Sequence, residues 1–246
     1  MCGRYAFLLP PEAMTAMFKV LKQVADYPPR YNITPTQPII VIAEREGRRT
    51  AELFRWGLVP GWVKDPKDFP LLINARAESM ADKPSFRDAL RNSRCIVPAS
   101  GYYEWMTGAD GKRRPYYITS AETETMAFAG LYSTWAGPNG EEVDTVCIVT
   151  VDPNLEISGV YDRMPAILRG EAAIDAWLNT RDVDVREAAA LAVSPPPGTM
   201  KYHAVGKAIG KATSEGPELI LHASADEDDE PPRKKKAAGA TQLDLF

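Results

Sequence analysis

Short apolar runs that alternate with polar residues dominate the chain as far as about residue 221. Runs of about four to eight residues bounded by Gly, Pro, Asn or Asp are typical of strands. They cover residues 39–43, 51–58, 94–98, 101–106, 116–119, 126–132 and 143–151, and one or two further strands are expected between residues 200 and 221. Most are joined by short turns, which predicts a single α+β domain. We expect a curved, mostly antiparallel β-sheet or open barrel with short flanking helices.

Four segments predict helices instead, namely residues 11–24, 84–92, 172–178 and 185–191. The apolar stripe of the first helix comprises Ala13, Met17, Val20, Leu21 and Val24. The prolines of residues 31–38 exclude an interior strand there. Residues 59–83 have little regular period but many polar and aromatic side chains, which is typical of a functional surface.

The overall composition is that of an ordinary globular protein, with 45% hydrophobic and 25% charged residues among 246. The net charge of −4 provides no basic field, so any DNA contact must come from a local patch. Three cysteines lie far apart and only two histidines are present, which predicts no disulfide framework, no metal site and no cofactor. Neither a signal peptide nor an apolar run of about 18 residues is found. We therefore expect a cytoplasmic monomer without membrane contact.

The composition changes at about residue 223. Residues 223–241 contain an acidic block, two prolines and a basic block, with no apolar residue larger than alanine. Such a segment cannot bury a core. We expect a folded domain over residues 1–222, a disordered charged linker over residues 223–241 and a separate motif over residues 242–246.

The second residue carries distinctive chemistry. An initiator methionine followed by a small residue is usually removed, which would leave Cys2 at the N-terminus. A terminal cysteine has a thiol and an α-amine on adjacent carbons, with ordinary pKa values of about 8.5 and about 7.7–8.0. The pair can condense with an aldehyde to form a five-membered thiazolidine ring. The alternative is that a cysteine merely follows the initiator methionine.

Polar side chains stand among apolar ones in six stretches. They are residues 1–4 (MCGR), 31–37 (YNITPTQ), 56–62 (WGLVPGW), 73–78 (INARAE), 98–105 (PASGYYEW) and 161–165 (YDRMP). In this order they resemble the SRAP family, the SOS-response-associated peptidases or abasic-site processing proteins. The resemblance implies the SRAP fold, self-removal of Met1 and binding of single-stranded DNA. It also implies covalent capture of the ring-opened abasic aldehyde as a thiazolidine. The protein would thus be an autopeptidase that is consumed when it crosslinks to DNA. An AP-lyase-like side activity is implied as well.

The resemblance assigns catalytic roles to Cys2 as the nucleophile and to Glu104 as the acid/base group. Opening the sugar and forming the imine both require proton transfer, and desolvation between aromatic residues raises the pKa of a glutamate. Asn74 is expected to orient the α-amine or the sugar hydroxyl, and Arg76 to clamp a phosphate from the same side of an extended segment. Taken alone, Glu104 would equally suit a solvent-facing strand end.

DNA-binding roles are implied for Arg4, Trp62, Trp105 and Arg163. The arginines are expected to contact phosphates. The tryptophans are expected to stack on bases beside the lesion, an interaction worth about 1–3 kcal/mol per base. The alternatives are surface ion pairs for the arginines and core positions for the tryptophans.

One position departs from the family pattern, because Tyr161 stands where a histidine usually precedes Asp-Arg-Met-Pro. With an ordinary pKa of about 10, a tyrosine cannot shuttle protons at pH 7 as a histidine does. We expect the crosslink to form normally, and its reversal or phosphate charge neutralisation to be altered. His203, Cys95 and Cys147 are expected to be structural, and Asn32 to shape a loop near the N-terminus.

The last five residues resemble the pentapeptide with which bacterial proteins dock into the replication sliding clamp. Gln242 would supply hydrogen bonds, and Leu243, Leu245 and Phe246 apolar anchors, at the end of a flexible tether. The alternative is that these residues pack back onto the domain.

Three hypotheses for the function follow. The leading one is a DNA-damage protein that shields abasic sites in single-stranded DNA near replication forks in the nucleoid, with that DNA and the sliding clamp as partners. The second is a cysteine peptidase acting on other proteins, which the lack of a histidine near a candidate cysteine motif weakens. The third is a clamp adaptor with a degenerate catalytic site, against which the joint presence of Cys2, Asn74, Arg76 and Glu104 argues.

Overall fold

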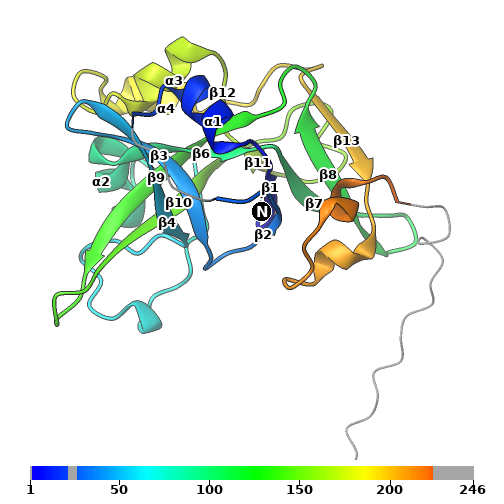
Figure 1. Cartoon of the computed structure of the whole chain (residues 1–246), viewed down its shortest axis with the longest axis horizontal. Helices are drawn as coiled ribbons and strands as arrows, with labels where there is room; N and C mark the ends of the chain where they lie inside the picture. The colour runs from blue at the N-terminus through cyan, green and yellow to red at the C-terminus, as the bar shows by residue number, and fades with distance from the viewer. Residues whose placement is uncertain (1, 22–26, 224–246) are drawn as a thin grey trace, which may run out of the picture.

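The computed structural model describes residues 2–21 and 27–223 of the chain, and strands outnumber helices in it (Figure 1). The strands are β1 (Tyr5–Phe7), β2 (Arg30–Ile33), β3 (Pro38–Arg45), β4 (Arg48–Trp56), β5 (Asn74–Arg76), β6 (Arg94–Ala99), β7 (Gly101–Thr107), β8 (Arg113–Ser120), β9 (Met126–Ala136), β10 (Glu142–Val151), β11 (Met164–Pro165), β12 (Ile167–Leu168) and β13 (Met200–Ala204). The helices are α1 (Pro11–Phe18), α2 (Pro84–Asn92), α3 (Glu171–Leu178) and α4 (Val185–Leu191).

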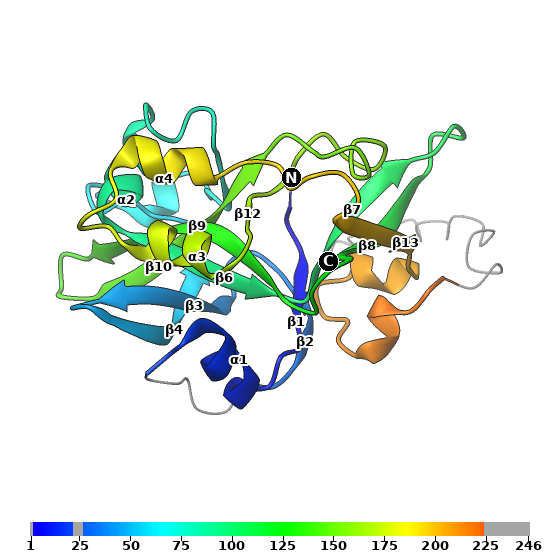
Figure 2. The same cartoon turned by 90° about the horizontal axis from the view of Figure 1, so that it is seen from above.

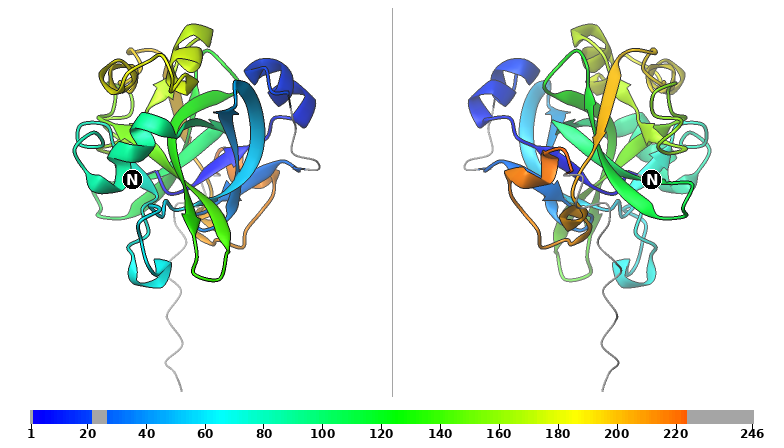
Figure 3. Two further views of the ribbon diagram at one scale, coloured as in Figure 1. Left: turned by 90° about the vertical axis from the view of Figure 1, so that its left-hand side faces the viewer. Right: turned by 90° about the vertical axis from the view of Figure 1, so that its right-hand side faces the viewer.

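Five strands form a closed ring that makes up the larger part of the domain. β3 pairs antiparallel with β4 and β6, β6 with β9, and β9 with β10, while β10 runs parallel to β4 and closes the ring. The helices α2 and α3 pack on β6 and β9, which is why β6 is buried along its whole length. The side views in Figure 3 show α3 and α4 above the ring and residues 59–73 (cyan) below it. The predicted α+β fold around a curved sheet is confirmed, and the barrel closes.

The second sheet has the strand order β13-β8-β7-β1-β2. β6 ends at Ala99 and β7 begins at Gly101, so with only Ser100 between them the chain passes directly from the barrel into this sheet. A Cβ atom on Gly101 would lie 2.3 Å from the ring of Tyr117, so only glycine permits this close approach. Figure 2 shows β1 lying between the barrel and the strands β7, β8 and β13. The N-terminal residues are therefore held in the seam between the two sheets.

The first helix differs from its prediction. It ends at Phe18, because Lys19 adopts a left-handed conformation with φ 54°. Phe18 is buried, whereas the predicted stripe members Met17 and Leu21 are 48% and 74% exposed. Within the helix the predicted stripe was wrong, because Met14 and Phe18 rather than Ala13 and Met17 face the core, whereas Val20, beyond the helix, is buried. Val24, its last predicted member, lies outside the described residues.

The other helices begin and end within one residue of their predicted bounds. The predicted irregularity of residues 31–38 is partly correct, since β2 ends at Ile33 before the first of the prolines and lies at the edge of the second sheet. Between residues 200 and 221 only β13 forms in the described chain, followed by two 3₁₀ turns. Within the described residues, no helix combines the length and apolar character required to cross a bilayer.

Candidate active site

The first residues of the chain lie along β7. Tyr5 of β1 stands opposite Tyr102 of β7, and the Tyr103 backbone N–H donates to the Arg4 carbonyl at 3.0 Å. The same antiparallel register places Gly3, the residue after Cys2, opposite Glu104. The Cys2 side chain is fully buried and Glu104 is 2% exposed. The fold thus brings together the thiol and the carboxyl that the sequence analysis selects.

Burial controls the protonation of both groups. Desolvation raises the pKa of Glu104 to about 7, although the Trp105 backbone N–H and the Arg113 guanidinium favour its charged form. Desolvation, followed by the negative charge of Glu104, raises the pKa of the Cys2 thiol far above its usual range. Near neutral pH, Glu104 is therefore present as both acid and base, as proton exchange during a reaction requires. The thiol stays protonated until another group assists it.

A groove opens over Glu104. A cavity of about 640 Å³ is lined by Gly3, Arg4, Ile73, Glu104, Trp105, Arg113 and Tyr161. An adjoining cavity of about 550 Å³ shares Trp105, Arg113 and Tyr161 and extends along residues 158–162. We call the two together the Glu104 groove. Of the predicted site residues, Arg4, Glu104, Trp105 and Tyr161 line it, and Cys2 is buried beside it.

Tyr161 faces Glu104 across the groove. Burial and then the charge of Glu104 raise the pKa of the Tyr161 phenol, while Arg113 lowers it. The Tyr161 backbone N–H donates to the Ile157 carbonyl at 2.9 Å, which holds the segment before β11 in a turn. The phenol thus stands near the Glu104 carboxyl as a neutral hydrogen-bonding group.

Asn74 and Arg76 lie at alternate positions of β5, which runs parallel to β10. The Asn74 side-chain amide donates to the Ile148 carbonyl at 3.4 Å. Its Oδ1 atom is buried and has no hydrogen-bond partner within residues 2–21 and 27–223. Arg76 is exposed, and Ile73, directly before Asn74, lines the groove. Neither Asn74 nor Arg76 is among the residues that line the groove.

Arg4 is fixed at the wall of the groove by its own hydrogen bonds. The guanidinium donates to Asn32 Oδ1 at 2.9 Å and to the carbonyls of Ile209 and Gly210 at 2.7 and 2.9 Å. It also lies 5.8 Å from the centre of the Trp105 ring, within range of a cation–π contact. Asn32, in strand β2, donates to two further carbonyls of the same segment, those of Lys211 and Ser214.

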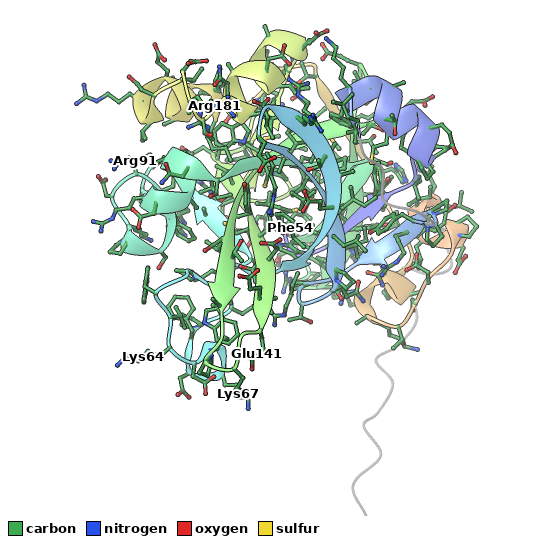
Figure 4. The ribbon with its side chains drawn as sticks, turned by 60° about the vertical axis from the view of Figure 1, so that its left-hand side comes forward. Phe54, Lys64, Lys67, Arg91, Glu141 and Arg181 are labelled. Atoms are coloured by element: carbon green, nitrogen blue, oxygen red, sulfur yellow. The ribbon has the colours of Figure 1, made fainter. Side chains whose placement is uncertain are left out.

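Two predicted DNA-binding residues lie away from the Glu104 groove, and Trp62 is the first. It is 56% exposed and packs edge-on against Phe69, in the segment between β4 and β5. Figure 4 shows Lys64 and Lys67 pointing outward from this segment, next to the β9–β10 turn that carries Glu141. Any DNA contact by Trp62 would therefore be made outside the groove.

Arg163 is the second. Its Nη1 donates to Glu78 and Asp152 at 2.8 and 2.6 Å, and its Nη2 donates to Glu78 and the Thr150 carbonyl at 2.9 and 2.6 Å. The side chain is buried, and both terminal nitrogens are bonded to acceptors of the protein. The ion-pair alternative describes Arg163 better than the expected phosphate contact.

Arg113 is a further groove residue, which stands in none of the six motif stretches of the sequence. It is exposed, lines both cavities and lowers the pKa of Glu104 and of Tyr161. It begins β8, across the β7–β8 turn from Glu104, so only the hairpin pairing brings it near. The Lys-Arg-Arg run at this turn was the available signal.

The residues expected to be structural are so placed. Cys95 and Cys147 are fully buried, and the His203 Nε2 donates to the Ile220 carbonyl at 2.8 Å while the ring stacks on His222. Within the described residues, no cluster of three His, Cys, Asp or Glu side chains could hold a metal ion. The predicted clamp-binding residues Gln242, Leu243, Leu245 and Phe246 lie outside the described residues.

A more enclosed cavity of about 330 Å³ lies between α1, β12 and α3. Its rim carries the ion pairs Lys19–Glu171 and Arg169–Glu122, and it holds none of the predicted site residues.

Comparison with known proteins identifies the family. The model of the family described as SOS response associated peptidase (SRAP) matches residues 1–212. This chain belongs to the SRAP family. The abasic site processing protein YoqW of Bacillus subtilis (strain 168) is 34% identical over 222 residues, which cover 89% of this chain and 99% of that SRAP relative.

Two further comparisons agree with the SRAP assignment. The abasic site processing protein YedK of Escherichia coli (strain K12) is 31% identical over 227 residues, covering 89% of this chain and 99% of that protein. A solved structure of a protein from Bacteroides thetaiotaomicron has a TM-score of 0.81 at 26% identity, covering 91% of this chain and 100% of that one. The SRAP membership predicted from the sequence motifs is confirmed.

Proposed function

We propose that this chain captures abasic sites in single-stranded DNA as a covalent thiazolidine. The observation that carries the proposal is the burial of Cys2 beside Glu104, a carboxyl with a pKa of about 7, at an open groove. The names of two SRAP relatives, both abasic site processing proteins, support the choice of substrate.

The first step is hydrolysis of the Met1–Cys2 peptide bond. Water adds to the Met1 carbonyl, the C–N bond breaks, and the α-amine of Cys2 leaves with a proton. Glu104 is suited to accept the proton of the attacking water and to return it to the amine, because its pKa lies near neutrality. This self-cleavage accounts for the peptidase in the family description.

The second step joins the protein to the lesion. A ring-opened abasic sugar presents an aldehyde, and the Cys2 α-amine adds to its carbon to give a carbinolamine. Glu104 protonates the departing hydroxyl, so that water leaves and an imine forms. The Cys2 sulfur then adds to the imine carbon, the π electrons move to nitrogen, and the thiol proton reaches that nitrogen through Glu104. One water is released in all.

The groove offers contacts for the flanking DNA. Arg4 and Arg113 place positive charge along it, and Trp105 offers a ring on which a base can stack. Arg76 is exposed beside Asn74 and could reach a phosphate. Contacts to the backbone and to base faces carry no sequence preference, which suits recognition of a lesion that can occur anywhere.

The test uses single-stranded oligonucleotides that contain one abasic site, a non-reactive tetrahydrofuran analogue of that site, or neither. We expect a denaturant-resistant adduct with the abasic oligonucleotide alone, and none after Cys2→Ala. The proposal fails if no adduct forms, or if Cys2→Ala leaves the adduct intact.

A peptidase acting on other proteins is a weaker alternative. A cysteine peptidase requires an activated thiolate with a neighbouring base such as histidine. Here burial raises the pKa of the Cys2 thiol, and both histidines of the chain, His203 and His222, stack together outside the Glu104 groove. A degenerate clamp adaptor is disfavoured by the retained groove chemistry.

We also propose that residues 242–246 dock this protein, as a monomer, onto the replication sliding clamp and so bring it to replication forks in the cytoplasm. The sequence Gln-Leu-Asp-Leu-Phe supports this proposal. Deleting residues 242–246 should abolish clamp binding and leave crosslinking unchanged. Loss of both activities, or of neither, would contradict the assignment.

A further inference from the structure

The hydroxyl of Tyr102 occupies an unusual position. Tyr102 is fully buried in β7, and its Oη has no hydrogen-bond partner within the described residues. A buried tyrosine hydroxyl normally finds a partner, and leaving one without costs about 1–3 kcal/mol. Phenylalanine would fill almost the same volume without that cost. The hydroxyl is therefore available to a group whose charge or position changes during the reaction.

The ring of Tyr102 is held firmly. Tyr102 stands opposite Tyr5 of β1, and its ring meets Phe128 edge-on with centroids 6.0 Å apart. Tyr5 also packs edge-on against Phe128 and against Trp56. Cys2 belongs to the same buried cluster. The hydroxyl therefore cannot swing out to solvent, and Tyr102 lies on the same face of β7 as Glu104, two residues along the strand.

The groups that face Cys2 can be named. Apart from the amino group of the chain, the titratable groups within the described residues that act on the thiol or respond to it are Glu104, Tyr102 and Tyr5. After desolvation, the thiol is the first group that raises the pKa of Tyr102, followed by Glu104. Tyr5 responds to Tyr27 before it responds to Cys2. Tyr102 therefore stays protonated and can only donate its proton in a hydrogen bond.

We propose that the Tyr102 hydroxyl donates a hydrogen bond to the Cys2 sulfur as the thiol loses its proton. The inference rests on the proposed crosslinking reaction. The electron pair of the sulfur forms the C–S bond, the π pair of the imine moves to nitrogen, and the thiol proton passes through Glu104 to that nitrogen. Tyr102 keeps its own proton throughout. It stabilises the negative sulfur and aims it at the imine carbon.

The adjacent tyrosine provides a matched control. Tyr103 is also fully buried, but its hydroxyl already donates to the Tyr31 carbonyl at 2.8 Å, in the smaller cluster with Tyr117. Tyr102→Phe removes a hydroxyl without a partner, whereas Tyr103→Phe removes a bonded one. Tyr102→Phe should therefore slow the reaction without lowering stability. Tyr103→Phe should lower stability without slowing the reaction.

The experiment measures single-turnover crosslinking to the abasic oligonucleotide from pH 5 to 10, together with melting temperatures. A hydrogen bond to a charged group is strong enough that its loss slows Tyr102→Phe by about tenfold at pH 7. Because the thiol stays protonated until it gives its proton to Glu104 during the step, we expect a slowing of similar size at every pH, with no loss of melting temperature. Tyr103→Phe should keep the wild-type profile and melt at a lower temperature.

Three outcomes would overturn the inference. One is a wild-type rate for Tyr102→Phe at every pH, and another is a slowing that comes with a lower melting temperature, since this would show a structural role for the hydroxyl. The third is an equal effect of Tyr103→Phe on the rate. If the wild-type protein itself gives no adduct, the proposed function fails instead, so the two failures are distinguishable.

Discussion

Two buried polar regions of this molecule differ in how completely the protein bonds them. The first is the Arg94 anchor, which we define as the Arg94 guanidinium and its carbonyl acceptors. Arg94 is 2% exposed. Its nitrogens donate to the carbonyls of Leu90, Trp177, Asn179 and Val183 at 2.9, 2.6, 2.6 and 3.0 Å. These bonds tie the start of β6 to the ends of α2 and α3.

The buried residues behind the Glu104 groove are the opposite case. Within the described residues, Tyr102 Oη and Asn74 Oδ1 are buried without hydrogen-bond partners, and burial raises the pKa of both Glu104 and Cys2. Fully bonded buried groups are typical of structural sites. Buried groups with unused bonding capacity and perturbed pKa values are typical of reactive sites. Mutations should therefore affect stability in one region and chemistry in the other.

The largest expected effect separates chemistry from stability in the groove. Glu104→Gln keeps the shape of the side chain but cannot exchange protons, so crosslinking should slow by about 10²–10⁴-fold. Glu124→Gln, at an exposed carboxyl between β8 and β9, should react at the wild-type rate. Single-turnover rates at pH 7 test this expectation. Near-wild-type crosslinking by Glu104→Gln would remove the acid/base role.

The next effect belongs to the Arg94 anchor. Arg94→Met leaves four carbonyls without their donor and should lower the free energy of unfolding by about 3 kcal/mol or more. Arg91→Met, at an exposed position of α2 that points outward in Figure 4, should change it little. Urea unfolding measures both. An equally stable Arg94→Met variant would show that the anchor is not structural.

A pH-dependent effect follows from the raised pKa of Glu104. The carboxyl titrates at about 7 in the folded protein and near 4.5 when unfolded. It therefore favours folding below about pH 4.5, and that contribution is lost as the pH rises through about 7. The loss amounts to about 3 kcal/mol, and Glu104→Gln avoids it. Urea unfolding should show the variant gaining stability relative to wild type between pH 4.5 and 8. A constant difference would mean that the pKa is not raised.

A smaller effect compares two adjacent arginines of the β7–β8 hairpin. Arg113 lines the groove, whereas Arg114 is paired with Asp110 through bonds of 3.0 and 2.7 Å. Arg113→Ala should weaken binding of undamaged single-stranded DNA by a few-fold. The slope of log binding constant against log salt concentration should fall by about the amount that one phosphate contact contributes. Arg114→Ala should do neither. Fluorescence anisotropy at several salt concentrations measures both, and equal losses would place the DNA elsewhere.

The smallest effect on adduct formation is expected at Tyr161. Tyr161→His restores a group that can exchange protons at pH 7. Adduct formation should remain within about twofold of wild type, because it depends on Cys2 and Glu104, whereas release of the crosslink should become faster. Following formation and release separately tests this. Identical release rates would show that having tyrosine instead of histidine at position 161 has no consequence for crosslink release.

The sequence predicted local features well and distant pairings only through the family resemblance. The bounds of α2 and the hairpin strands follow from the apolar pattern and turn residues. The ring closure between β4 and β10, and the pairing of β1 with β7, join segments far apart in the chain that no local pattern relates.

The candidate site shows the same division. Cys2 and Glu104 could be named from motifs, but their burial and the raised pKa values depend on packing around them. Arg163 was expected at DNA because a lone arginine in a motif does not reveal that Glu78 and Asp152 bind it. Tyr102 and Arg113 were missed because their roles depend on what lies opposite them in the fold.

The central claim is that Cys2 closes a ring with the abasic aldehyde through both its nitrogen and its sulfur. The most direct test is mass spectrometry of the N-terminal peptide after nuclease and protease digestion of the borohydride-treated adduct. The claim predicts a peptide that begins at Cys2, lacks Met1 and carries the sugar remnant with the loss of one water and no added hydrogen. A peptide that retains Met1, a remnant on another residue, or a reduced imine with two added hydrogens would contradict it.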